Sequence, residues 1–148
     1  MNFIVKFFAT GFFVGYLPGA PGTYASLAVA IAWRLLPEKS FLIIFLILFA
    51  ISFFVCGRAE TLFGKKDDGR IVIDEYVGMF TAVAFLPRNF YVLAAGFILF
   101  RFFDIKKPFF IKSVQKLDGS AGVILDDILA GLASNLLIRL FMFAAAKI

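Results

Sequence analysis

Carboxylates are the side chains in this sequence best suited to chemistry. Two adjacent pairs, Asp74-Glu75 and Asp126-Asp127, lie near the start of apolar segments, and Asp104 closes another. A single acid at a helix N-terminus is stabilised by the helix dipole. Two neighbouring acids in an apolar setting instead repel each other, so we expect a cation or a tight basic network between them.

The absence of histidine narrows the chemistry further. It excludes Ser-His-Asp triads and histidine-ligated metals. The single cysteine, Cys56, lies at the end of an apolar run and is expected to be a packing residue. With only oxygen ligands left, the expected ion is Mg²⁺, with Mn²⁺ as a substitute. The predicted metal ligands are Asp74, Glu75, Asp126 and Asp127.

Basic and hydroxyl groups accompany these acids. Arg101 precedes Asp104 by one helical turn, so both can face one site, and Lys107 follows at once. Thr23 ends a Pro/Gly-rich segment, which is interpreted equally well as a phosphate cradle or as a plain turn. The predicted phosphate-binding residues are therefore Thr23, Arg101 and Lys107. The predicted catalytic residues are Asp74, Glu75, Asp104, Asp126 and Asp127.

The composition indicates which elements position these groups. The chain has 148 residues, 62% of them apolar, 22 phenylalanines and a mean hydropathy of +0.96. So small a body cannot hide that much apolar surface. We therefore expect one domain, 1–148, folded as an all-α polytopic membrane bundle of about four to five apolar segments. The N-terminal segment is broken by a Pro/Gly-rich turn at 17–23 into the parts 3–17 and 24–36. The other segments are 41–57, 71–86, 90–103 and 121–146. Whether 3–17 crosses the membrane or folds back stays open.

The distribution of bases predicts the orientation. Three bases (Arg34, Lys39 and Arg88) lie in the connections 34–40 and 87–89, on one side of the membrane. Nine lie in the connections 58–70 and 101–116, which are therefore expected in the cytoplasm. These are Arg58, Lys65, Lys66, Arg70, Arg101, Lys106, Lys107, Lys112 and Lys116. This topology brings eight of the ten carboxylates to the cytoplasmic face of the membrane, Asp67, Asp68 and Asp118 among them.

Four motifs occur together in order along nearly the whole chain. They are GYLPGAPGT at 15–23, IVIDEYVG at 71–78, FRFFDIKKP at 100–108 and GVILDDILAG at 122–131. Jointly they resemble the phosphatidylglycerophosphatase A family. Ala25, Phe110 and Leu125 depart from its usual residues, but none of these changes removes a charged or hydroxyl group.

This resemblance implies a Mg²⁺-dependent phosphatase that converts phosphatidylglycerophosphate to phosphatidylglycerol and inorganic phosphate. Its partner would be a membrane phospholipid and no nucleic acid. Attack by water and attack by an aspartate both remain open. An alcohol phosphatidyltransferase is the nearest alternative, but Asp118-Gly119 is not followed by the Ala-Arg of that class. An ion-coupled transporter would spread its acids across the bilayer rather than gather them at one face.

Overall fold

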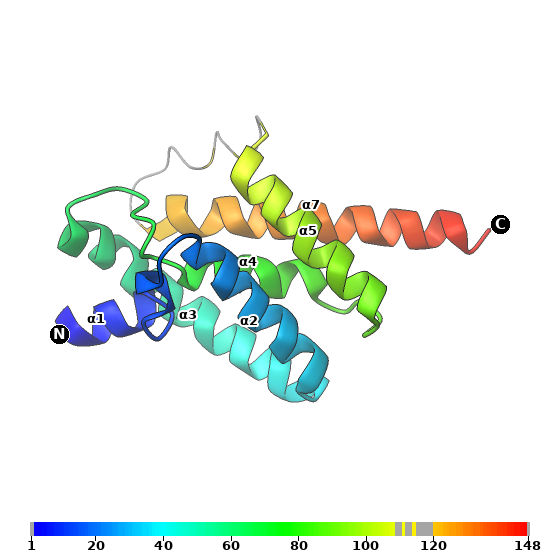
Figure 1. Cartoon of the computed structure of the whole chain (residues 1–148), viewed down its shortest axis with the longest axis horizontal. Helices are drawn as coiled ribbons and strands as arrows, with labels where there is room; N and C mark the ends of the chain where they lie inside the picture. Colours follow the sequence, from blue (N-terminus) through cyan, green and yellow to red (C-terminus); the bar gives the residue numbers. More distant parts are fainter. Residues whose placement is uncertain (1, 109–110, 112–113, 115–119, 148) are drawn as a thin grey trace.

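The computed structural model describes residues 2–108, 111, 114 and 120–147. The described part is all-α, as expected from the sequence, with six α-helices and one 3₁₀ helix (Figure 1). Lys112, Lys116 and Asp118, expected on the cytoplasmic side, and Phe110 lie outside the described residues. The elements are α1 (Asn2–Ala9), η1 (Val14–Tyr16), α2 (Pro21–Leu35), α3 (Glu38–Phe63), α4 (Ile73–Val83), α5 (Phe90–Lys106) and α7 (Ser120–Ala145).

Two helices, α3 and α7, are long and apolar enough to cross a membrane. Each has 26 residues, or about 39 Å at 1.5 Å per residue, against a hydrocarbon core of about 30 Å. Only 22% and 28% of their most apolar windows are buried inside the protein. Most of this apolar surface therefore faces outward, as a lipid-facing helix requires.

The central helix α4 differs from the span expected over 71–86. It has 11 residues, or about 16 Å, which is too short to cross the hydrocarbon core. The chain leaves the helix at Ala84, and Phe85 has a positive φ of 56°. Nine of the 11 residues of α4 are buried, and the helix runs alongside α7 (Figure 1). The apolar character of this segment therefore reflects burial against other helices of the protein and not against lipid.

The N-terminal segment folds back against the start of α4. Helix α1 has only eight residues, and a turn with positive φ at Gly11, Phe12 and Phe13 follows it. The Val72 amide donates to the Ala9 carbonyl at 2.8 Å, and the Tyr76 hydroxyl donates to the Gly11 carbonyl at 3.0 Å. Residues 3–17 are therefore no single spanning helix.

The break before α2 lies earlier than the sequence analysis placed it. Pro21, Gly22 and Thr23 already belong to the first turn of α2. Proline is tolerated there because the first helical amide has no partner within the helix. This shift matters because it brings the N-terminus of α2 to the acidic residues.

Candidate active site

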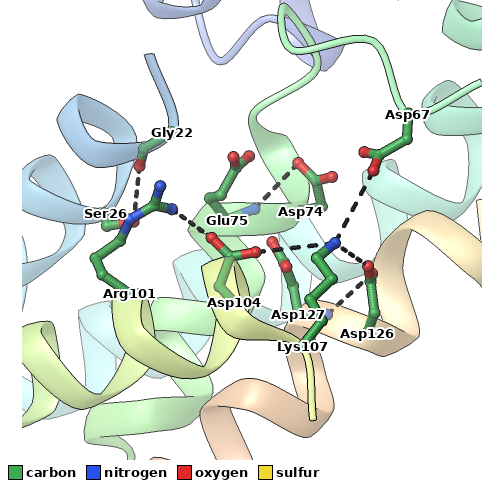
Figure 2. A network of polar contacts seen from close by, with 10 residues as sticks. All are labelled: Gly22, Ser26, Asp67, Asp74, Glu75, Arg101, Asp104, Lys107, Asp126 and Asp127. Carbon is green, nitrogen blue, oxygen red and sulfur yellow. Dashed lines mark hydrogen bonds and ion pairs between the residues drawn. The ribbon is translucent and has the colours of Figure 1, made fainter. Parts of the chain in front are cut away.

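The acidic residues predicted from the sequence lie on three helices that meet at one place (Figure 2). Asp74 and Glu75 lie in the first turn of α4, and Asp104 lies in the last turn of α5. Asp126 and Asp127 lie two turns into α7. The first turn of α2 closes the site from a fourth side.

Three of the acids form a compact buried triad. Asp74, Glu75 and Asp127 each offer a carboxylate oxygen, and these oxygens lie within 4.8 Å of one another. Asp74 is 5% exposed and Asp127 is 3% exposed. Glu75 Oε2 and Asp127 Oδ2 are buried with no hydrogen-bond partner among the described residues.

The donor set of this triad fits a hard cation. Buried carboxylate oxygens without partners are costly, because they lose their hydration and gain nothing in return. A cation between them would supply the missing partner, and an all-oxygen set suits a hard divalent ion. The triad is therefore a buried acidic group that could hold a metal.

Asp126 lies beside the triad with a different partner. Its Oδ2 accepts a hydrogen bond from Lys107 Nζ at 2.5 Å, and its side chain is buried. Lys107 follows the end of α5 with a positive φ of 40°. The same Nζ lies 4.0 Å from Asp104 Oδ1 and 3.9 Å from Asp67 Oδ2. The distribution of bases predicted Asp67 on the cytoplasmic side of the membrane, but nothing in the sequence indicated its contact with Lys107.

Arg101 faces the triad from α5. Its Nη1 donates to Asp104 Oδ2 at 2.6 Å, and its side chain is 16% exposed. Its Nε is buried without a hydrogen-bond partner in the described structure. The sequence predicted this Arg101–Asp104 pair from the one-turn spacing.

Gly22 is the contact that the sequence analysis missed. A Cβ at this position would lie 2.1 Å from Glu75 Oε1 and 3.2 Å from Arg101 Nη1. Any side chain here would therefore occupy the space of the Glu75 carboxylate. The glycine-rich composition of the segment was the available signal, but it did not show which glycine closes on the acids.

Thr23 and Cys56 lie outside this contact network. Thr23 is half-buried in the first turn of α2 and makes no hydrogen bond to the acids of the described structure. Cys56 is a free thiol fully buried in α3, in agreement with a packing role.

Comparisons with known proteins bear on this site. The sequence model of one family, Phosphatidylglycerophosphatase A, matches residues 7–142. The chain is 39% identical over 134 residues to a Phosphatidylglycerophosphatase A of Haemophilus influenzae, covering 86% of this chain and 82% of the relative. It is 36% identical over 131 residues to the Phosphatidylglycerophosphatase A of Escherichia coli K12, covering 85% and 76%.

A third relative carries a different lipid in its name. The chain is 37% identical over 150 residues to a Bacteroides thetaiotaomicron protein provisionally named a phosphatidylinositol-3-phosphatase, covering 93% of this chain and 92% of the relative. No solved structure matches the chain.

Proposed function

Because this chain belongs to the phosphatidylglycerophosphatase A family, we propose that its buried acidic triad and Arg101 form the active site of a Mg²⁺-dependent lipid phosphatase. The reaction is the hydrolysis of the terminal phosphomonoester of phosphatidylglycerophosphate to phosphatidylglycerol and inorganic phosphate. The observation that carries the proposal is the set of buried, unpartnered atoms on Glu75, Asp127 and Arg101. The two carboxylate oxygens can bind a cation, and the Arg101 N–H can bind an anion, so the site can hold both ions side by side.

Asp74, Glu75 and Asp127 are the proposed metal ligands. One oxygen from each lies within 4.8 Å of the others, and the set contains no nitrogen or sulfur ligand. When bound, Mg²⁺ would neutralise these acids, polarise the phosphoryl group and orient the attacking oxygen. Asp126 has a second role in this proposal, because its bond to Lys107 holds that ammonium beside the cluster.

Arg101 is the proposed phosphate-binding group. Asp104 fixes the guanidinium through Nη1, which leaves Nε free to donate to a phosphate oxygen. The first turn of α2 adds the positive end of its helix dipole, with the Gly22 amide as its backbone donor. Pro21 has no N–H, and the Thr23 and Tyr24 amides donate to the Ala20 carbonyl at 3.0 and 3.1 Å. Lys107 contributes a second positive charge from the opposite side of the acids.

Two chemical routes fit these groups. In the first, water attacks phosphorus, the bond to the glycerol oxygen breaks, and the leaving oxygen takes a proton. In the second, an aspartate oxygen attacks first and water later hydrolyses the acyl phosphate. Acid quenching during turnover with ³²P-labelled substrate separates them, because only the second route leaves the label on the protein.

We also propose that the enzyme is anchored in the inner membrane, with the site at the cytoplasmic face. The long apolar helices α3 and α7 support the anchoring. The excess of bases in the connections on the side of the acids supports the orientation. At that level a headgroup phosphate can reach the triad while its acyl chains remain in the bilayer.

Phosphate release by the purified protein tests the assignment. Inorganic phosphate should appear from phosphatidylglycerophosphate in mixed micelles, stop in excess chelator and return with Mg²⁺. Asp127→Asn and Glu75→Gln should each reduce the rate by at least ~100-fold, because each removes a charged ligand. Glu38→Gln is the matched control, since this exposed acid lies at the far end of α3. Full activity in excess chelator would contradict the metal assignment.

The relative from Bacteroides thetaiotaomicron makes a second lipid worth testing in the same assay. Phosphatidylinositol 3-phosphate also carries a terminal phosphomonoester, so the same triad and arginine could act on it. We expect a higher kcat/KM for phosphatidylglycerophosphate, in agreement with the family to which the chain belongs. A higher kcat/KM for phosphatidylinositol 3-phosphate would instead make the phosphoinositide the proposed substrate. Phosphate release without an added alcohol excludes the phosphatidyltransferase alternative.

A further inference from the structure

The C-terminal end of α4 packs against α7, and its last carbonyl groups need donors there. α4 ends at Val83, and the chain turns through Ala84 and Phe85. The last carbonyls of a helix have no partner within the helix. Val83 is buried and Ala84 is half-buried, so other parts of the protein supply donors at this end of the helix.

Asn135 and Arg139 of α7 supply these donors. Asn135 Nδ2 lies 3.2, 3.1 and 3.0 Å from the carbonyl oxygens of Thr81, Ala82 and Ala84. Arg139 Nη2 donates to the carbonyls of Ala84 and Phe85, both at 3.2 Å.

The two side chains are also joined to each other. Arg139 Nε donates to Asn135 Oδ1 at 2.7 Å. This bond and the carbonyls around Nδ2 fix the orientation of the amide, because only its nitrogen can donate and only its oxygen can accept. Asn135 is 9% exposed, so it would lose these bonds without replacement from solvent.

These residues continue a stripe that reaches the active site. Asp127, Gly131, Asn135 and Arg139 follow one another at intervals of four on α7, so they share one face of the helix. Between the acid and the amide, the backbones of the two helices touch. A Cβ on Gly131 would lie 2.3 Å from the Gly78 carbonyl oxygen, and one on Gly78 would lie 2.8 Å from the Asp127 carbonyl oxygen.

The contact along this stripe fixes the position of α4 in two directions. The glycines set how close the helices lie, because the backbones have no side chain between them. Asn135 and Arg139 set the axial register, because they bind carbonyls at one defined end of α4. Asp127 lies about 12 Å from Asn135 along α7, and that register places it opposite Asp74 and Glu75.

We propose that Asn135 and Arg139 are positioning residues for the phosphatase reaction, which hold α4 in the register that brings Asp74 and Glu75 to Asp127. This inference rests on the proposed function, because it assumes that the three acids bind a divalent ion. Neither residue touches the substrate or the ion. Their effect passes through the position of α4.

Metal binding, measured apart from catalysis, tests the proposal. Mn²⁺ binding to the purified full-length protein is followed by electron paramagnetic resonance, with Mg²⁺ as the competitor. In Asn135→Leu, which keeps the branched shape and removes the bonds, the Kd for Mn²⁺ should rise about 10–100-fold. The Mg²⁺ concentration that gives half-maximal phosphate release should rise in parallel. Arg139→Leu should shift both in the same direction, and its exposed position makes it the variant less disruptive to folding.

Ser134→Ala is the matched control. Ser134 is the buried neighbour of Asn135, but its hydroxyl donates to the Ala130 carbonyl of its own helix at 2.7 Å. This variant should bind Mn²⁺ like the wild type. A role of Asn135 in stability alone would lower the melting temperature and leave the Kd of the folded protein unchanged.

The outcomes separate the two proposals. Unchanged Mn²⁺ affinity in folded Asn135→Leu and Arg139→Leu, beside normal binding by the wild type, would overturn the positioning role and leave the proposed function intact. A wild-type protein that binds no Mn²⁺ would instead overturn the metal assignment, and the positioning role with it.

Discussion

At the residue scale, the candidate site requires a glycine at position 22. The Glu75 carboxylate lies where a side chain at position 22 would begin, 2.1 Å from the site of its Cβ. The carboxylate is the far end of a flexible side chain, so an added methyl would displace it rather than unfold the protein. The geometry of the acidic triad therefore depends on a residue that carries no functional group.

Gly22→Ala should therefore impair function with little loss of stability. We expect a fall in phosphate release of roughly 10–100-fold and a higher Mg²⁺ requirement, because Glu75 is moved from the triad. Gly69→Ala is the control, since a Cβ there would meet nothing within 4 Å. Melting temperatures of the two variants show whether folding is preserved. Wild-type activity in Gly22→Ala would contradict the packing of α2 against the triad.

Arg101→Lys separates phosphate binding from metal binding. Lysine keeps the charge but loses the planar fork that bonds Asp104 and a phosphate at the same time. We expect kcat/KM to fall roughly 10–100-fold, as for the loss of a charge-assisted hydrogen bond. The Mg²⁺ dependence should stay nearly unchanged. Steady-state kinetics that show no effect would remove Arg101 from the site.

At the scale of elements, the segment between α3 and α4 delivers Asp74 and Glu75 to the site. Arg70 Nε and Nη2 bond Asp68 Oδ1 and Oδ2 at 2.7 and 3.0 Å, and the Arg70 guanidinium lies 4.0 Å above the Phe63 ring. The Asp68 backbone carbonyl accepts from the Ile71 amide at 2.8 Å. The pair therefore shapes the entry into α4.

The titration of Asp68 gives a prediction for this segment. The hydrogen bond from Arg70 lowers the pKa of the Asp68 carboxyl below its usual 3.8. A lowered pKa in the folded state stabilises the protein above the unfolded value, and this contribution is lost as the pH falls through the folded value. Wild type should therefore melt higher than Asp68→Asn at pH 7, and the difference should shrink below pH 3.8. Thermal unfolding of both proteins in detergent at pH 7 and below pH 3.8 checks this prediction. A difference in melting temperature that stays the same at both pH values would contradict it.

At the scale of the whole molecule, the ends of α3 report the orientation in the membrane. Lys39 near its start and Lys66 just beyond its end are both exposed. In a Cys56→Ala background, a cysteine at position 66 should react with an impermeant thiol reagent from the cytoplasmic side. A cysteine at position 39 should react from the opposite side. The reverse labelling pattern would overturn the cytoplasmic placement of the site.

Much of the candidate site could be predicted from the sequence, because it depends on residue type and short spacing. The oxygen-only chemistry follows from composition, and the Arg101–Asp104 pair follows from one helical turn. The division of roles between Asp126 and Asp127 could not be predicted. Adjacent residues on a helix point about 100° apart, so Asp127 joins the triad while Asp126 bonds Lys107. Which of the two faces the triad depends on how α7 is rotated against α4.

The sequence by itself determined the all-α class, the apolar character of the long helices and the family to which the chain belongs, since these reside in composition and local motifs. Only the tertiary structure decided that α4 is a short buried helix, that Gly22 closes on Glu75 and that Asn135 and Arg139 bind the end of α4. The physical reason is that an apolar segment indicates burial but does not indicate whether lipid or other helices of the protein bury it. Contacts between residues 50 or more positions apart are set by helix packing, which no local pattern encodes.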